Sequence, residues 1–294
     1  MGRRFGIEIE FGLRGQASLQ DVVTAIREAG LSTRTSMHGY TGNSMTEWVV
    51  KTDGSVSHGG ELVSPPLDFE NPEHRAQVDR AVAALVTAGA KTYQQAGIHV
   101  HIESGDFQAK DLSALVRVFT KFEDCIWRIA SSGWQTIRSG ARQYCKPLSQ
   151  QQVEGLAKAR TDDQVKRAYY GQGYAYASGH GHGSRYHGLN LHSHFYRGTV
   201  EFRVFNSSLN AARIQTYIAI CMALMVDAKS GRMRSIGKAY RLGAMASGQV
   251  TEEKALFNFL QVLRYQAGMS VEDYRNVKRF WRDSRPQAAT SAIY

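Results

Sequence analysis

The sequence predicts an α+β protein with an antiparallel sheet and flanking helices, and three observations support this class. Apolar and polar residues alternate over several short segments, as in strands, and apolar residues recur at helical spacing over longer ones. The two kinds of segment do not alternate as the regular βαβ units of a parallel sheet. Tyr196, Arg197 and Gly198 form a short link between the last two expected strands, which is typical of an antiparallel hairpin.

In chain order, alternation predicts strands at 4–13, around 46–51, and at 60–64, 97–103, 187–195 and 198–206. Helical spacing predicts helices at about 18–29, 73–88, 109–131, 150–168, 211–229, 251–267 and 271–282. The segment 171–188 is rich in Gly, Tyr and His and lacks periodicity, so we expect a long loop beside a site. No repeat or Pro/Ser-rich linker divides the chain, and we expect one domain over 1–294.

The composition is that of a globular protein with a positive charge. The chain has 294 residues, of which 43% are hydrophobic, and a net charge of +10. The hydrophobic content excludes disorder as the main state, and the positive charge favours polyanionic partners. Cys125, Cys145 and Cys221 have no disulfide or zinc-site spacing, which favours a reducing compartment. The N-terminal residues do not resemble a secretory signal, and the apolar stretch 218–226 is too short to span a bilayer. We therefore expect a cytoplasmic protein with no membrane partner.

Four of the expected strands carry polar residues on one face, because side chains two positions apart on a strand point the same way, about 6–7 Å apart. One such strand alone is more typical of a half-exposed sheet. Four together favour a divalent-metal site, since carboxylate oxygens and imidazole nitrogens are metal ligands and lysine is scarce on these faces. The face residues are Glu8 and Glu10; His99, His101 and Glu103; Asn190, His192 and His194; and Glu201 and Arg203.

Clustered carboxylates repel one another unless cations lie between them, and Mg²⁺ or Mn²⁺ would offset that repulsion. Such ions also bridge substrate phosphates, and arginine forks suit phosphate oxygens. Arg203 shares the face of Glu201, and Arg185 and Arg142 lie in flanking loops. The sequence contains no P-loop, GxGxxG, HExxH or GxSxG motif, so phosphate binding would come from metals and arginines.

Five sequence blocks resemble, in order and spacing, those of the amidoligase family, which is related to glutamine synthetase and glutamate–cysteine ligase. They are FGIEIEFG (5–12), KTDGSV (51–56) leading to GELVSPPL (60–67), GIHVHI (97–102), RYHGLNLH (185–192) and GTVEFRVFNSSLN (198–210). The resemblance covers a motif-bearing core at 4–215, while 216–294 matches no motif and is expected to be a helical C-terminal portion. It implies the antiparallel sheet of the glutamine synthetase catalytic core around two or three divalent ions.

The resemblance also implies an ATP-dependent carboxylate–amine ligase. ATP would phosphorylate a small-molecule or peptide carboxylate, and an amine would attack the acyl phosphate to form a peptide-like or isopeptide-like amide. Carried over by motif, the metal ligands would be Glu8, Glu10, Glu61, His99 and Glu201. The catalytic residues would be Arg203, Arg185 and Glu201, and the nucleotide or substrate would contact His101, Asn190, Arg142, Asp53 and Arg203. Asp53 could equally be a turn residue of its Asp-Gly bend.

Several alternatives stay open on the sequence alone. A metal-dependent hydrolase or nuclease acting on a polyanion would also use clustered Glu and His, and a basic nucleic-acid-binding module would use the charge. A general base could be His187, His192, His194 or a carboxylate, and the segment 171–188 is a candidate lid. The acid, the amine, a nucleic-acid substrate and the choice between monomer and small homo-oligomer are not determined.

Overall fold

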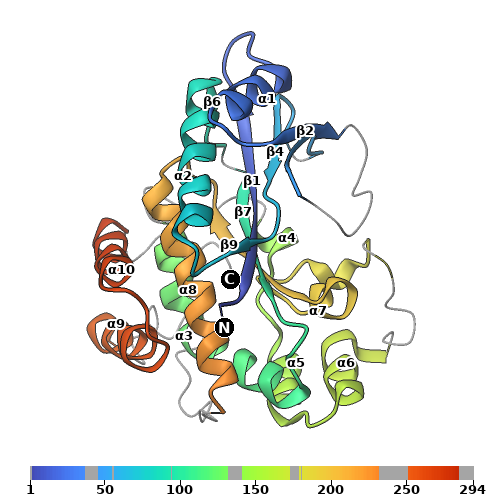
Figure 1. Ribbon diagram of the computed structural model, residues 1–294. Helices are drawn as coiled ribbons and strands as arrows, with labels where there is room; N and C mark the ends of the chain where they lie inside the picture. The colour runs from blue at the N-terminus through green and yellow to red at the C-terminus, as the bar shows by residue number, and fades with distance from the viewer. Residues whose placement is uncertain are drawn as a thin grey trace.

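A mixed α/β architecture built on one mostly antiparallel sheet is visible in the computed structural model, which describes residues 2–36, 46–54, 56–93, 95–131, 141–172, 179, 181–231 and 251–284 (Figure 1). Seven strands follow the order β2-β3-β4-β1-β7-β9-β8, and β5 and β6 also pair with β1. Only the β2–β3 pair is parallel among the described pairs. The strands are β1 (Arg4–Leu13), β2 (Thr33–Ser36), β3 (Trp48–Lys51), β4 (Gly59–Val63), β5 (Leu67–Asp68), β6 (Ala90–Lys91), β7 (Gly97–Glu103), β8 (Leu189–Asn190) and β9 (Thr199–Asn206).

Helices cover one face of this sheet. Figure 1 shows α2, α8 and α3 along that face, with α9 and α10 outside them. The helices are α1 (Leu19–Glu28), α2 (Pro72–Thr87), α3 (Ala109–Ala130), α4 (Ala141–Tyr144), α5 (Gln150–Lys158), α6 (Asp162–Tyr170), α7 (His192–Arg197), α8 (Ala211–Lys229), α9 (Glu252–Gln261) and α10 (Val271–Asp283). A 3₁₀ turn, η2, spans Gly183–Arg185, and a π-helical turn, η3 (Val262–Gln266), continues α9. The predicted antiparallel sheet with flanking helices is confirmed.

The core lies between the sheet and its covering helices. The alternate residues of β1, β7 and β9 that face α3 and α8 are fully buried, among them Ile9, Val100 and Phe202. Phe202 meets Phe119 of α3 with ring centroids 6.0 Å apart. Because alternation places one set of side chains in this core, the other set must point to the opposite face of the same strands.

Helix α8 is long and apolar enough to cross a membrane by length and composition alone, with a mean hydropathy of 1.3. However, 78% of that window is buried inside the protein, where α8 contacts α3, α2, α10 and β7. This burial is typical of a core helix. The three cysteines are free and buried, so the prediction that they form no disulfide framework is confirmed.

The expected strand at 187–195 and the hairpin after it are wrong. Only Leu189–Asn190 is a strand, and the next residues form the short helix α7, which connects β8 to its antiparallel partner β9. Gly198 ends α7 in the left-handed conformation at φ 74°, so this glycine is a helix cap rather than a hairpin residue. His192 and His194 therefore lie on a helix, and their alternation with Ser193 and Phe195 has no strand meaning.

The helix expected at 150–168 is two helices. Ala159 is extended and ends α5, and the Thr161 hydroxyl accepts a hydrogen bond from the backbone N–H of Gln164 at 3.3 Å and begins α6. A threonine followed by acidic residues is a start signal that the apolar periodicity conceals. The short strands β2, β5 and β6 were not predicted, because two to four residues are too few to show alternation.

Candidate active site

Strand pairing brings the predicted metal-ligating residues together on the polar face of the sheet. Glu8 of β1 lies opposite His99 of β7, and His101 lies opposite Glu201 of β9. On the other side of β1, Glu10 lies opposite Glu61 of β4. Residues directly opposite on antiparallel strands have Cβ atoms about 5 Å apart, so strand pairing brings six side chains from four strands together.

A cavity of about 250 Å³ opens over these residues. Its lining is strongly polar, because it contains four buried glutamates, three histidines and four cationic side chains. The lining residues are Glu8, Glu10, Lys51, Asp53, Glu61, His99, His101, Arg185, Asn190, His192, Ser193, Tyr196, Arg197, Glu201 and Arg203. Charged side chains are rarely buried unless they are paired or bind ions.

Glu8 is the centre of the cluster. Its carboxylate lies 3.0 Å from His99 Nδ1 and 3.4 Å from His101 Nε2. The same two rings lie near Glu201, at 3.6 Å from His99 Nδ1 and 3.7 Å from His101 Nε2. Two groups of three side chains place a ligand atom of each residue within 4.8 Å of the others, and Glu8 belongs to both. The groups are Glu8, Glu61 and His99, and Glu8, His101 and Glu201.

Glu8 and Glu201 are held as carboxylates. Burial alone would raise the pKa of Glu8, but hydrogen bonds and charge interactions with His101 and His99 outweigh it and hold that pKa well below its usual range. Burial is also opposed at Glu201, where Arg203, His101 and His99 lower the pKa to about 2. Arg203 donates to Glu201 at 2.5 Å, and the buried carboxylates raise the pKa of its guanidinium further.

Glu61 shows the opposite electrostatic environment. Its burial and the neighbouring Glu8 raise its pKa well above the usual value, although Lys51 lies 2.7 Å away and opposes that shift. The pKa of Lys51 is raised, because the attraction of Glu61 and Glu8 exceeds the effect of its own burial. The cavity therefore holds a carboxyl group that one ammonium group does not fully compensate, and a further cation at this position would stabilise its charged form.

The donor set fits hard divalent cations. His99 Nε2 and His101 Nε2 are buried and have no hydrogen-bond partner among the described residues. Buried imidazole nitrogens normally have a partner, so these atoms, directed at carboxylates 3.4 to 3.7 Å away, suit shared coordination of an ion. Carboxylate oxygens dominate the set, which favours Mg²⁺ or Mn²⁺ over a thiolate-type zinc site.

Two of the arginines predicted to bind phosphate, Arg203 and Arg185, line the cavity. Arg203 also donates from Nε to the carbonyl of Tyr144 at 3.2 Å, which fixes its plane. Arg185, at the end of η2, donates to the Tyr186 hydroxyl at 2.8 Å and lines the cavity. Arg197, which the sequence analysis took for a hairpin residue, adds a third guanidinium. Guanidinium groups that share a cavity with clustered carboxylates can bind phosphate oxygens next to metal ligands.

The Asn190 side chain is hydrogen-bonded to Glu201. Its amide nitrogen donates to Glu201 Oε2 at 2.6 Å, and its side-chain oxygen lies 3.4 Å from the Tyr169 hydroxyl and the Ser193 backbone N–H. The side chain thus orients the Glu201 carboxylate, and substrate contact remains a prediction for it. Asp53 lines the cavity beside Lys51. The side chain of Arg142, and residues 173–178 and 180 of the candidate lid, lie outside the described residues.

Sequence reasoning missed four lining residues: Lys51, Ser193, Tyr196 and Arg197. Lys51 ends the apolar run WVVK, and a lone lysine at that position was the available signal. Of the three histidines named as possible bases, only His192 lines the cavity, where burial lowers its pKa. His194 bonds to Ser104 at 2.8 Å and His187 contacts Lys146 and Gln152, so neither is among the cavity lining.

A cavity on the face of an antiparallel sheet that is lined by carboxylate, imidazole and guanidinium groups defines a candidate metal- and phosphate-binding site. The family model described as "Putative amidoligase enzyme" matches residues 1–225, and the chain belongs to this family. The recognition made from the five sequence blocks is confirmed. A comparison with curated proteins finds no match.

One solved structure supports the fold. A bifunctional glutathione synthetase from Pasteurella multocida superposes with a TM-score of 0.53 at 13% identity, over 99% of this chain and 48% of the other. The chain thus spans about half the length of that protein. The complex of the prokaryotic ubiquitin-like protein Pup with its ligase PafA matches with a TM-score of 0.41 at 14% identity, over 99% of this chain and 65% of the other.

Proposed function

We propose that the protein is an ATP-dependent carboxylate–amine ligase that forms an amide through an acyl phosphate. One observation carries this proposal: two carboxylate–imidazole groups share Glu8 on one face of the sheet, next to Arg203, Arg185 and Arg197. Transfer from a triphosphate uses divalent cations and guanidinium donors. The cavity of this chain carries candidate ligands for the cations and three guanidinium groups. The proposed core is of the glutamine synthetase type, within a single domain.

The metal ligands of this proposal are Glu8, Glu10, Glu61, His99 and Glu201, with His101 in the second group of donors. Bound Mg²⁺ or Mn²⁺ would neutralise phosphate oxygens and increase the electrophilicity of the γ-phosphorus. Glu10 is fixed by the backbone N–H of Gly97, which donates to its carboxylate at 2.6 Å. Glu201 is fixed by Asn190 and Arg203.

The chain's own residues then act on charge and water. Arg203 and Arg185 bind the transferring phosphoryl group and stabilise the negative charge that develops on it. The acceptor carboxylate attacks the γ-phosphorus, ADP leaves, and an uncharged amine displaces phosphate from the acyl carbon. The buried floor of the cavity limits access of water to the acyl phosphate, which would otherwise hydrolyse. His192 lines the cavity, but its Nε2 donates to the carbonyl of Gly179 at 2.9 Å and its Nδ1 lies 2.8 Å from the Tyr170 hydroxyl, so it accepts the proton of the amine only if the bond to Tyr170 opens.

The first experiment is thermal unfolding with and without ATP and Mg²⁺ or Mn²⁺. A ligand that binds the folded state at about one hundred times its dissociation constant adds roughly 2.7 kcal/mol to stability. We expect ATP to raise the midpoint only when metal is present, and Glu8→Gln to abolish that rise. Glu103→Gln is the matched control, because Glu103 is on the same strand face but pairs with Arg4 outside the cavity lining.

Release of ADP upon addition of carboxylate and amine mixtures then tests the reaction itself. Stabilisation by metal alone, with no effect of ATP, would contradict the ligase proposal and favour the metal-dependent hydrolase or nuclease considered for the sequence. That alternative is not favoured, because it explains neither the family nor the presence of Arg185, Arg197 and Arg203 in the cavity. Cytoplasmic location, a monomer or small homo-oligomer and a nucleic-acid substrate remain predictions.

A further inference from the structure

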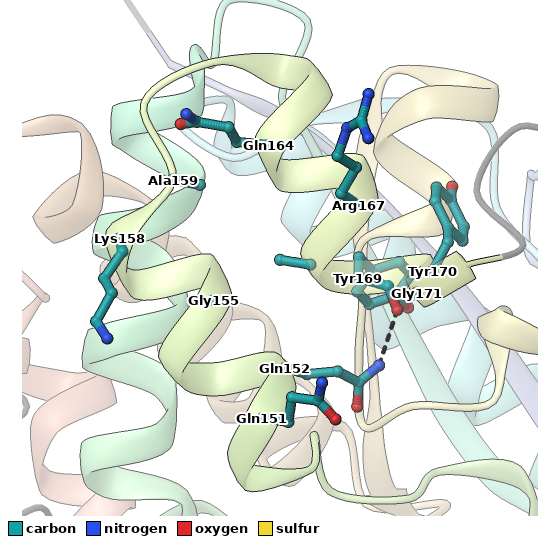
Figure 2. Close-up of a pocket in the computed structure, with 11 residues that line it drawn as sticks. Gln151, Gln152, Gly155, Lys158, Ala159, Gln164, Arg167, Tyr169, Tyr170 and Gly171 are labelled. Carbon is teal, nitrogen blue, oxygen red and sulfur yellow. Dashed lines mark hydrogen bonds between the residues drawn. The ribbon is translucent and has the colours of Figure 1, made fainter.

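A second cavity lies between α5 and α6, away from the Glu/His cluster (Figure 2). Its volume of about 610 Å³ exceeds that of the catalytic cavity and lies within the range of about 300–1,000 Å³ typical of ligand sites. We call it the α5–α6 cavity. Its lining residues are Gln151, Gln152, Gly155, Lys158, Ala159, Gln164, Arg167, Ala168, Tyr169, Tyr170 and Gly171.

The walls of the α5–α6 cavity are fixed by packing. Helices α5 and α6 pack tightly at Gly155, where an added Cβ would lie 2.9 Å from Ala168 Cβ. The end of α5 is attached to α3, because Ser113 and Arg117 both donate to the carbonyl of Ala157. Gly155, Ala159 and Ala168 leave a floor of small apolar groups, so the space between the two helices is not filled by the helices' own side chains.

The lining carries cations and amides and no carboxylate. Lys158 comes from the end of α5 and has no ion-pair partner among the described residues. Arg167 comes from α6, and its Nε donates to Asp163, one turn away on the same helix, at 2.8 Å. Figure 2 shows Lys158 on α5 and Arg167 on α6, with Gln164 near the start of α6, and the side chains of Lys158 and Arg167 extend in different directions in this view. Such a lining is complementary to carboxylate groups.

Tyr169 and Tyr170 line the α5–α6 cavity, and their hydroxyl groups contact Asn190 and His192, which line the catalytic cavity. The Tyr169 hydroxyl donates to the carbonyl of Ser184 at 2.7 Å. The Tyr170 hydroxyl lies 2.8 Å from His192 Nδ1, and His192 lines the catalytic cavity. On the other side, Gln152 donates to the Tyr169 carbonyl at 2.9 Å (Figure 2). A chain bound between α5 and α6 would therefore pass Tyr170 on its way to the metal-binding residues.

We propose that the α5–α6 cavity binds a peptide substrate that carries carboxylate side chains, and that the reacting group of this peptide extends past Tyr170 into the catalytic cavity. This inference rests on the proposed ligase function. A nucleic acid fits less well, because binding to a phosphate backbone uses rows of cations and stacking platforms. This lining offers two cations, one of them shared with Asp163, above a floor of alanine and glycine.

Fluorescence anisotropy with a labelled four-residue glutamate peptide tests the site without knowledge of the natural substrate. We expect saturable binding that weakens as salt is raised, and no comparable binding of the tetraglutamine peptide. Gln164→Glu places a negative charge in the lining at nearly constant shape and is expected to weaken binding about threefold or more. Gln20→Glu makes the same charge change on exposed α1 and is the matched control, with unchanged binding.

A second pair of variants tests the cations. Lys158→Gln should weaken glutamate-peptide binding about threefold, whereas Lys166→Gln should not, because Lys166 lies over the Phe195 ring and is absent from the lining. Equal losses in both members of either pair, or no saturation up to millimolar protein, would overturn the inference. Equally strong competition by a thymidine oligonucleotide would overturn it in favour of nucleic acid.

Glu8→Gln separates this inference from the proposed function. The variant should bind the glutamate peptide as the wild type does while it loses stabilisation by ATP and metal. Peptide binding without any ATP–metal effect in the wild type would refute the ligase function and leave the peptide site standing. Stabilisation of the wild type by ATP and metal without binding of the glutamate peptide would refute the peptide site alone.

Discussion

The two faces of the sheet are made by the same strands and are both buried, yet their burial has opposite energetic effects. On the helix-covered face, Ile9, Val100 and Phe202 are 0% exposed. On the cavity face, Glu8 and Glu201 are only 8% and 5% exposed. Apolar burial contributes about 25 cal/mol per Å² of surface removed from water, whereas buried charges cost free energy unless partners or ions compensate them.

This difference teaches where stability and function are placed. Apolar burial on the helix-covered face stabilises the fold. Burial of the carboxylates on the cavity face lowers that stability, because these groups lose their hydration. Changes on the first face should therefore unfold the protein and leave the chemistry of folded molecules intact. Changes on the second should remove ligand effects with a smaller loss of stability. The following variants test this separation.

The largest effect is expected for Phe202→Ala on the helix-covered face. Removal of a fully buried phenylalanine that contacts Phe119 should cost about 3–5 kcal/mol in the free energy of unfolding, measured with urea. Protein that remains folded should keep its stabilisation by ATP and metal. A loss of less than about 1 kcal/mol would show that β9 does not pack into the core as described.

A pH-dependent change in the free energy of unfolding is expected from Glu123, a buried carboxyl group on α3. Burial, with the nearby charge of Asp124, raises the pKa of this carboxyl group to about 8. Between its unfolded pKa near 4.5 and about 8, the unfolded state is ionised while the folded state holds the proton. Folding stability should therefore fall as pH rises, by up to about 1.4 kcal/mol per pH unit.

Glu123→Gln should remove that slope while leaving stability below pH 4.5 nearly unchanged. Urea unfolding of both proteins across this pH range gives the comparison. Glu201 differs, because its pKa is lowered to about 2 and its contribution is lost only as pH falls toward that value. Parallel pH profiles for wild type and Glu123→Gln would refute the assignment to Glu123.

A smaller effect is expected for Thr199→Val beside the cavity. The Thr199 hydroxyl lies 3.2 Å from His101 Nδ1 and 2.9 Å from the Ser193 hydroxyl, and so it orients the imidazole toward Glu8 and Glu201. Loss of this hydroxyl should cost about 1 kcal/mol of stability but about tenfold in metal affinity, measured by titration calorimetry. Thr199→Ser should restore metal binding, and an affinity unchanged in the valine variant would exclude the positioning role.

The smallest effect is expected for Glu103→Gln at the edge of the cavity face. Glu103 follows the alternation of His99 and His101, but its side chain is 39% exposed and pairs with Arg4 at 2.6 Å. Exposed ion pairs contribute roughly 0.2–1 kcal/mol, so unfolding should change by no more than that. The stabilisation by ATP and metal should be unchanged. If it disappeared, the functional face would extend beyond the cavity.

Much of the site was predictable because it depends on local alternation. The pattern in β1, β7 and β9 places Glu8, His99 and Glu201 on faces opposite the core, and the structure brings these side chains together. The same rule failed after Asn190, since the histidines of α7 alternate by chance within a helix. Glu103 satisfies the pattern too, and only its position at the end of β7 separates it from the cavity.

By itself, the sequence determined the residue types, the family, the strands β1, β7 and β9 and the sheet face on which their side chains lie. These properties depend on neighbours along the chain, through the two-residue period of a strand and the order of motifs. The tertiary structure alone decided that β1 lies between β4 and β7, so that Glu8 can meet both histidines while Glu10 meets Glu61. It also decided the contact of Asn190 with Glu201 and the α5–α6 cavity. Strand order, register and helix packing join residues far apart in the chain, and local periodicity carries no information about such contacts.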